Sequence, residues 1–167
     1  MCIRDSYLLE LARACSPNPQ RPLWLQEIGA PRTHVPNAIA ATFMTTTMTS
    51  LTSTPGLEAI TWWCSHDVSH DLLDFPKLEY SLGLFTNDGK PKPEALALSD
   101  ILPDLHNAQP QNQLDEPLEF SANWDTGQGR STCSPIGDLF AQWVDQAERT
   151  GKAPRLRRVR TQHCPVP

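Results

Sequence analysis

The sequence lacks the features that would point to a membrane or to a nucleic acid. No apolar run approaches the roughly 18 residues that are needed to span a bilayer. Positive charge is scarce, because 14 Lys and Arg stand against 19 Asp and Glu, which gives a formal net charge of -5. Such a balance favours solubility and argues against a nucleic-acid-binding protein. We therefore expect neither a membrane nor a nucleic acid as a partner.

The sequence also lacks paired cysteines. Its five cysteines form no CxxC pair and no zinc-binding pattern. An odd, scattered set indicates free thiols or a reducing compartment. Cys64 lies two residues before His66, but no third group is in place to orient a thiol nucleophile, so we interpret Cys64 as structural. The five are Cys2, Cys15, Cys64, Cys133 and Cys164.

The first six residues, Met-Cys-Ile-Arg-Asp-Ser, match the translation of an adapter used in sequencing libraries. We interpret residues 1–6 as a scar and exclude them from the prediction of the fold. On this interpretation the N-terminal part of the protein is missing together with any signal peptide, so the sequence assigns no compartment. The alternative is a natural N-terminus.

Helical and strand-like patterns alternate over the first two thirds of the chain. The two predicted strands are short apolar runs bounded by turn residues, which favours buried strands. A long loop at 65–78, rich in His and Asp, precedes an extended piece at 82–85 and a turn at 87–89. This alternation predicts βα units with a parallel sheet. The predicted order is helix, strand, helix, strand, helix, at 7–15, 22–28, 37–52, 57–64 and 93–105.

The chain changes character from residue 107. Residues 109–113 form a polar linker and residues 127–129 a turn. The patterns predict strands at 118–124 and 156–159 and a helix at 136–149. A basic run near the end alternates with apolar residues, so we interpret it as a solvated strand face and not as a nucleic-acid footprint. The run comprises Lys152, Arg155, Arg157, Arg158 and Arg160.

Glu27 is the first candidate for chemistry, because it lies at the C-terminal end of the first predicted strand, next to a turn. A buried strand rarely tolerates a carboxylate unless the group is paired or used. In β/α barrels the active site lies at this end of the strands. A glutamate just past the strand, solvated or salt-bridged, explains the local sequence equally well.

Two adjacent indoles, Trp62 and Trp63, end the second predicted strand. An indole at the mouth of a barrel can stack on the apolar face of a sugar ring, although core packing is the more common role of a Trp. Side chains alternate along a strand, so at most one of the two indoles faces a substrate.

The loop that follows contains His66 and His70, four residues apart, with Asp67 between them. This spacing is similar to the HExxH zinc pattern. However, Asp replaces Glu, and the segment follows a strand instead of lying within a helix, so we expect no metal and no other cofactor. The remaining interpretations are hydrogen bonding to sugar hydroxyls and a solvated loop.

Three stretches together resemble the last quarter to third of a clan A glycoside hydrolase, most nearly family 5. Residues 24–29, Trp-Leu-Gln-Glu-Ile-Gly, resemble the seventh barrel strand, which carries the nucleophilic Glu of the clan. Residues 60–64, Ile-Thr-Trp-Trp-Cys, resemble the eighth strand, whose Trp lines the subsite of the reacting sugar. Residues 82–93, which end in Asp-Gly-Lys-Pro-Lys-Pro, resemble the segment that leads into the last barrel helix and are the most specific of the three.

The resemblance implies an α/β fold class: about the last two βα units of a (β/α)8 TIM barrel, followed by a short α+β tail. It divides the chain into the scar at 1–6, the C-terminal part of a barrel catalytic domain at 7–106 and an extension at 107–167. Two units of this kind cannot close a barrel, so we expect exposed apolar faces and aggregation of the chain by itself.

For the site, the resemblance implies that Glu27 is the nucleophile and that Trp63 is the subsite Trp, with a cis peptide bond to Cys64. It also implies that His66 and Asp67, on the loop after the eighth strand, contact sugar hydroxyls. Trp62 is the second indole of this candidate substrate-binding set.

The implied activity is that of a retaining glycoside hydrolase on oligo- or polysaccharides with β-linked sugars, of the β-mannoside or β-glucan type. The acid/base Glu of the clan usually follows an Asn, but this sequence contains no Asn-Glu dipeptide. We therefore expect the acid/base to lie outside this chain, and the chain alone to be inactive although its full-length parent is active. Two alternatives are a carbohydrate-binding module without catalysis and a metallohydrolase that uses His66 and His70.

Overall fold

The computed structural model describes residues 3–108, 116–123 and 126–159, which form two compact units. The described part of unit 1 is the continuous segment 22–108. Unit 2 combines residues 3–21 with the described residues after 115. The linker predicted at 109–113 lies outside the described residues. Among the helices that the structure describes, none has the length and apolar character to cross a membrane.

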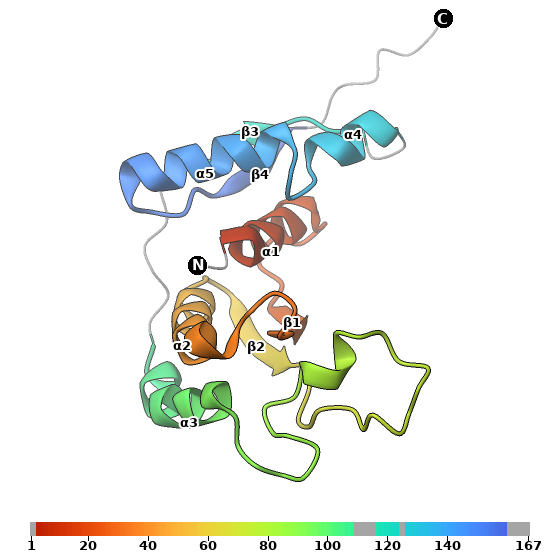
Figure 1. The fold of residues 1–167 in the computed structure, drawn as a ribbon. Coiled ribbons are helices and arrows are strands. Elements are labelled where there is room, and N and C mark those ends of the chain that lie inside the picture. Colours follow the sequence, from red (N-terminus) through yellow and green to blue (C-terminus); the bar gives the residue numbers. More distant parts are fainter. Residues whose placement is uncertain (1–2, 109–115, 124–125, 160–167) are drawn as a thin grey trace, which may run out of the picture. The chain divides into compact units, whose positions relative to one another are not determined.

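Unit 1 alternates strands and helices, as Figure 1 shows. β1 and β2 pair in parallel, and α2 connects them, which confirms the predicted parallel strands. The helices predicted at 37–52 and from residue 93 are confirmed as well. A short 3-10 turn, η1, lies between β2 and α3. The bounds are β1 Leu23–Ile28, α2 Asn37–Thr52, β2 Leu57–Trp62, η1 Glu79–Ser81 and α3 Pro93–His106.

Proline and apolar spacing explain where the two helices of unit 1 form. Pro93 occupies the first turn of α3. A backbone N–H at this position would have no acceptor within the helix, so proline costs no hydrogen bond there. Pro36 occupies the position just before the first residue of α2 and makes no capping hydrogen bond with a side chain. The buried residues of α2 recur at helical spacing, so one face of that helix is covered. They are Ala40, Met44, Thr47, Met48 and Leu51.

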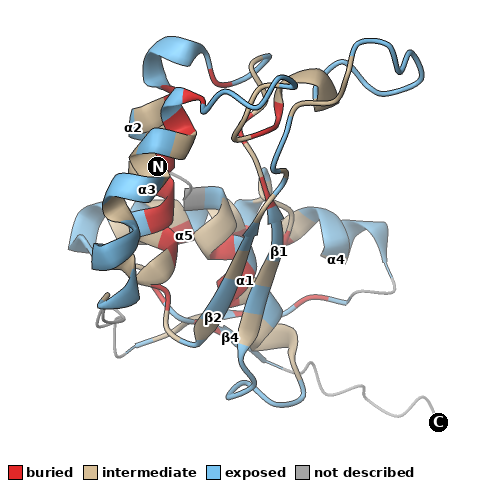
Figure 2. Cartoon of the chain, turned by 90° about the horizontal axis from the view of Figure 1, so that it is seen from below, coloured by how far each residue is buried: buried red, intermediate tan, exposed pale blue. Residues whose placement is uncertain are grey.

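The strands of unit 1 are less buried than the sequence predicts. Ile28 is the one buried residue of β1, and β2 has none, as the tan and blue strands in Figure 2 show. The sheet has two strands, so each strand has one unpaired edge, and the prediction of buried strands is wrong for this chain.

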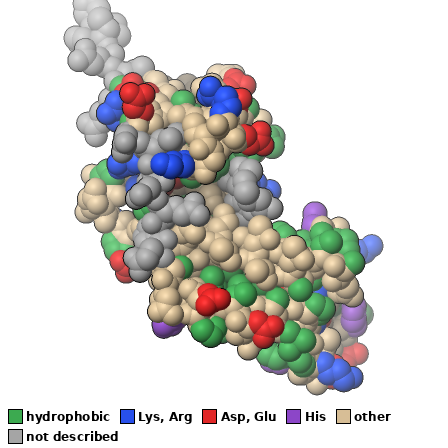
Figure 3. Space-filling view, turned by 90° about the vertical axis from the view of Figure 1, so that its left-hand side faces the viewer, with side chains coloured by type: hydrophobic (Ala, Val, Ile, Leu, Met, Phe, Trp, Pro, Cys, Tyr) green, Lys and Arg blue, Asp and Glu red, His purple; other side chains and the backbone are tan. Residues whose placement is uncertain are grey.

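The helices of unit 1 also carry exposed apolar side chains, as the sequence predicts. Ile39, Leu96 and Leu102 are at least half exposed. Figure 3 shows the side of the molecule on which α2 and α3 lie in Figure 1. Hydrophobic side chains gather on the surface of unit 1 that faces the viewer there.

The extended piece predicted at 82–85 forms no regular strand. It runs beside the segment after β2, where the Leu84 N–H donates to the Cys64 carbonyl (3.0 Å) and the Phe85 N–H donates to the Ser65 carbonyl (2.9 Å). The long loop after β2 is thereby folded back along the end of the strand.

Unit 2 contains a parallel strand pair of its own, β3 with β4, connected by two helices. The strands and the helix predicted in the tail are confirmed, with shorter strands. The turn predicted at 127–129 is wrong, because Thr126 caps a short helix there: its hydroxyl accepts from the Gly129 N–H at 3.0 Å. The bounds are α1 Ile3–Cys15, β3 Leu118–Phe120, α4 Gly127–Thr132, α5 Asp138–Thr150 and β4 Leu156–Arg158.

Aromatic residues from both ends of the chain build the core of unit 2. Tyr7 of α1 is fully buried and donates its hydroxyl to the Cys133 carbonyl at 2.9 Å. Its ring meets Trp143 of α5 edge-on, and the Trp143 indole N–H donates to the Pro154 carbonyl at 2.8 Å. Helix α1 therefore packs with the tail, whereas the sequence places residues 7–15 in the barrel portion.

The helix α1 begins at Ile3, within the segment interpreted as a scar. The origin of residues 1–6 stays a prediction. At the other end of the unit, Leu156 of β4 is buried while Arg157 and Arg158 are exposed, which confirms the predicted solvated strand face for the described part of the basic run.

Candidate active site

A pocket of about 400 Å³ lies at the C-terminal ends of β1 and β2. Two carboxylates and one indole line it, and the other lining residues are apolar or glycine. None of the residues that line it is a Lys, Arg or His. They are Glu27, Ile28, Gly29, Pro31, Trp63, Leu78, Glu79 and Leu82.

The register of the two strands brings Glu27 and Trp63 into this pocket. Ile28 pairs with Trp62, and the Trp63 N–H donates to the Ile28 carbonyl at 2.8 Å. Because the strands are parallel, their carboxyl ends meet at the same edge of the sheet. The peptide bond from Trp63 to Cys64 is cis, as the resemblance implies.

Gly29 permits the close approach of the two strand ends. A Cβ atom at this position would lie 2.5 Å from the Trp63 carbonyl oxygen and 2.9 Å from a methyl group of Leu82. The first of these atoms is backbone and cannot rotate away. A side chain at residue 29 would therefore push the two ends of the site apart.

Glu27 is exposed, so the prediction of a buried carboxylate is wrong in that respect. The sheet has only two strands, and the end of β1 is open to solvent. Among the described residues no Lys, Arg or His forms an ion pair with Glu27. Its carboxylate is therefore accessible to a ligand in the pocket.

The two indoles point to opposite sides of β2, as strand alternation predicts. Trp63 lines the pocket and is 46% exposed. Trp62 packs instead against the buried cluster of Ala30, Val35 and Ala40. Its indole N–H is buried without a hydrogen-bond partner among the residues that the structure describes.

Glu79 is a site residue that the sequence does not predict. The indole N–H of Trp63 donates to its Oε2 at 3.2 Å. Glu79 begins η1, at the end of the long loop after β2. No periodic pattern places that loop, and only the folded chain brings Glu79 back to the strand end.

Asp67 belongs to a charged cluster beside the pocket and does not line it. The Lys92 ammonium donates to Asp67 Oδ1 at 2.8 Å, and the Gly83 N–H donates to the same oxygen at 2.8 Å. The Asp67 side chain is 15% exposed and that of Lys92 9%. Asp67 thus fixes the loop, and its predicted contact with a sugar hydroxyl stays a prediction.

The same cluster continues into α3 through a second ion pair. The Arg32 guanidinium donates to both carboxylate oxygens of Glu94, at 2.5 and 2.6 Å. The Glu94 side chain is 1% exposed, and Lys92 lies 3.6 Å from it. Two cations and two anions therefore balance, and they join the loops after β1 and β2 to the first turn of α3.

The two loop histidines stack on different aromatic rings. His66 lies on Phe85 with ring centroids 5.3 Å apart, and His70 lies on Tyr80 with centroids 4.6 Å apart. Neither lines the pocket. Within the described ranges, no group of three or more His, Cys, Asp or Glu side chains is placed to hold a metal ion.

The thiol of Cys64 is held in its protonated form. Burial raises its pKa above the ordinary value, and the nearby carboxylates of Glu79 and Asp67 raise it further. A thiol nucleophile needs the opposite shift. The geometry therefore agrees with a structural Cys64.

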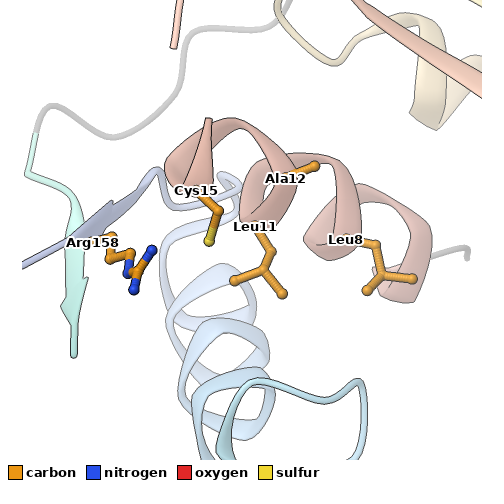
Figure 4. Close-up of a pocket in the computed structure, with 5 residues that line it drawn as sticks. All are labelled: Leu8, Leu11, Ala12, Cys15 and Arg158. Atoms are coloured by element: carbon orange, nitrogen blue, oxygen red, sulfur yellow. The ribbon is translucent and has the colours of Figure 1, made fainter. Parts of the chain in front are cut away.

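A second pocket, of about 480 Å³, lies within unit 2 and contains none of the predicted site residues. Figure 4 shows it along one face of α1, where the Arg158 guanidinium points from β4 toward Cys15. Burial raises the pKa of Cys15, and Arg158 opposes that rise only in part. The lining residues are Leu8, Leu11, Ala12, Cys15 and Arg158.

Comparison with protein-family models and with curated proteins gives no match. Solved structures do match. A GH5_18 protein from Streptomyces cattleya, in complex with GlcNAc, is 38% identical over 96% of this chain, with a TM-score of 0.81. A variant of GH5_18 from Bifidobacterium longum subsp. longum, in complex with Manβ1-4GlcNAc, is 30% identical over 93% of the chain, with a TM-score of 0.83. A GH5_18 from Bifidobacterium longum subsp. infantis is 32% identical over 93%, also with a TM-score of 0.83.

This chain spans about 38% of the length of the first of these structures and 37% of the other two. The matches confirm the predicted fold class, because both units are covered by part of an α/β barrel protein. They also confirm the predicted resemblance to a C-terminal fragment of such a protein.

Proposed function

We propose, from the similarity of this chain to part of a family 5 glycoside hydrolase, that the complete protein cleaves β-linked mannosides with retention of configuration. Glu27 is the nucleophile in this proposal. The observation that carries it is the pocket that Glu27 and Trp63 share at the ends of two parallel strands.

The chemistry follows from an accessible carboxylate beside an exposed indole. Trp63 stacks on the apolar face of the sugar and holds its anomeric carbon near Glu27. An oxygen of Glu27 attacks that carbon as the glycosidic bond breaks, and the leaving oxygen takes a proton from a second carboxyl group. Water then attacks the anomeric carbon, the bond to Glu27 breaks, and the second carboxylate takes the proton from water.

In this proposal the second carboxyl group lies outside the 167 residues of this chain. A retaining enzyme places its two carboxyl groups roughly 5–5.5 Å apart, on opposite sides of the bond that breaks. The family motif for the acid/base has no counterpart among these 167 residues. We infer that the chain by itself binds sugar without turning it over.

The substrate class comes from the similar structures, which hold GlcNAc and Manβ1-4GlcNAc. We infer that this site takes a β-linked mannoside whose leaving group is GlcNAc or a similar neutral sugar. The pocket supports that choice, because its lining offers an indole and two carboxylates to hydroxyl groups and no cation to an acidic sugar.

The decisive experiment traps the nucleophile in the complete protein. An activated 2-deoxy-2-fluoro-β-mannoside forms a covalent intermediate that water releases slowly, and mass spectrometry of the digested protein locates the sugar. We expect the label on Glu27. A Glu27→Ala variant is expected to lose nearly all turnover and to yield an α-mannosyl azide when azide is added.

Glu58, an exposed carboxylate in β2 that does not line the pocket, provides the matched control. Glu58→Gln is expected to retain turnover and labelling. A label on another carboxylate would show that this other residue, and not Glu27, is the nucleophile. Sugar binding by a complete protein that neither turns over nor takes up the label would favour the carbohydrate-binding module instead.

A further inference from the structure

Glu79 is the one carboxylate of the pocket to which the proposed mechanism gives no task. It faces the same space as Glu27 and touches the indole that receives the sugar. We propose that Glu79 is a sugar-binding residue: its Oε2 holds the Trp63 indole, and its Oε1 accepts a hydroxyl of the sugar stacked there. This inference rests on the proposed function and names a further determinant of its substrate.

The contact with Trp63 fixes the plane on which a sugar would stack. Trp63 is 46% exposed, so packing covers only part of its indole and the hydrogen bond of its N–H adds to the hold on the ring. The Trp63 N–H donates to Glu79 Oε2 at 3.2 Å, and a carboxylate acceptor makes this a charge-assisted bond. The carboxylate therefore lies at the edge of the ring, beside any sugar on its face.

The second oxygen of Glu79 is available. Among the described residues the structure gives its Oε1 no hydrogen-bond donor, and no cation forms an ion pair with this carboxylate. An ionised carboxylate has about four acceptor positions, and the indole occupies one. Sugar hydroxyls are donors of the kind that fill the others.

The backbone around Glu79 is held in place by the charged cluster. The Lys92 ammonium donates to the Ser81 carbonyl at 3.0 Å, and the Arg32 N–H donates to the Ser81 hydroxyl at 3.1 Å. Ser81 and Glu79 belong to the same turn, η1. The carboxylate is therefore positioned before a sugar arrives, which is what selective binding requires.

The charge of the pocket sets the chemical class of the sugar. The lining that the structure describes for this chain contains two carboxylates and no Lys, Arg or His. A uronic acid would bring a third negative charge into the same space, and like charges at this distance repel. We therefore expect the site to take neutral hexosides and to reject the corresponding uronides, with Glu79 contributing to that choice.

The test compares Glu79→Gln and Glu79→Ala with Glu58→Gln in the complete protein, on an aryl β-mannoside and its monodeoxy analogues. Glu79→Gln keeps an oxygen for the indole but removes the charge that the sugar meets. We expect kcat/KM on the parent mannoside to fall about 10- to 100-fold, the range for a lost hydrogen bond to a charged group. The loss should be absent for the one deoxy analogue that lacks the partner hydroxyl. Glu79→Gln should also narrow the preference for the mannoside over the mannuronide.

A purely structural role would give a different pattern. Glu79→Gln would then lower kcat/KM by the same factor on every analogue and leave the preference over the mannuronide unchanged, and either result overturns the inference. Trapping of Glu27 by the fluorinated mannoside in the same variants tests the proposed function separately. Suppose that a Glu79 variant still takes the label on Glu27 but loses kcat/KM by the same factor on every analogue. This result would refute the role proposed for Glu79 and still support Glu27 as the nucleophile.

Discussion

Replacing Glu94 by Gln is expected to loosen α3 from the rest of unit 1. Glu94 accepts two hydrogen bonds from Arg32, and its side chain is 1% exposed against 19% for Arg32. The substitution keeps the shape and removes the charge. The cluster would then hold two cations, Arg32 and Lys92, against the single carboxylate of Asp67.

The expected magnitude follows from the burial of that pair. Removing one partner of a buried ion pair typically costs about 3–5 kcal/mol, because the other charge stays desolvated. Arg32 retains some contact with water, so the lower end, about 3 kcal/mol, is the appropriate value. That free energy corresponds to an increase of roughly 100-fold in the opening equilibrium of α3.

Hydrogen exchange read by mass spectrometry measures this opening for the peptides of α3, independently of unit 2. Asp88→Asn is the matched control, since it removes a carboxylate from the exposed pair with Lys90 in the same unit. That pair has 76% and 60% exposed side chains and should contribute nothing measurable. Equal protection of α3 in the two variants would refute the assignment of stability to the buried pair.

Three further predictions concern the site, the core of unit 2 and the chain as a whole. Gly29→Ala should abolish the activity of the complete protein, because its Cβ would meet the Trp63 carbonyl at 2.5 Å; activity near that of the unchanged protein would contradict this. Burial raises the pKa of Tyr7, Cys133 and Cys15 in the folded state, so these acids release protons more readily when unfolded. Stability of unit 2 should therefore be intact below pH 9, the lowest of the unperturbed values, and fall as the pH rises above it; Tyr7→Phe should weaken the slope above pH 10, as measured by denaturant titration at each pH. The 167-residue chain by itself should associate with rising concentration and fail to cleave an aryl mannoside, which light scattering and a direct assay would check.

Local patterns predicted the parallel strands and the two long helices of unit 1, and they placed Glu27 at a strand end; the resemblance then selected Trp63 from the two indoles. Parallel strands have a common carboxyl edge, so a Glu at the end of one and a Trp at the end of the next must approach each other. Strand alternation also separates Trp62 from Trp63. Both predictions use only the direction of neighbouring strands and the alternation of side chains along one strand, which can be read from the sequence.

The rest depends on contacts between segments that no periodicity connects. Glu79 reaches Trp63 because the long loop folds back, and Arg32 reaches Glu94 across 62 positions. Asp67 pairs with Lys92 across 25 positions, a contact that the sequence does not predict, and its contact with a sugar hydroxyl stays a prediction. Residues 127–129 begin a helix instead of forming the predicted turn, and the Thr126 hydroxyl accepts the Gly129 N–H at the start of that helix.

The hydrogen bond from Tyr7 to Cys133 joins positions 126 residues apart, and the described part of unit 1 lies between them in the sequence. During synthesis, residues 22–108 are made before Cys133, the hydrogen-bond partner of Tyr7. Helix α1 therefore leaves Tyr7 uncovered until the segment that carries Cys133 has been made. Deleting the tail would remove Cys133 and Trp143 from around Tyr7, so the extension is needed to bury α1.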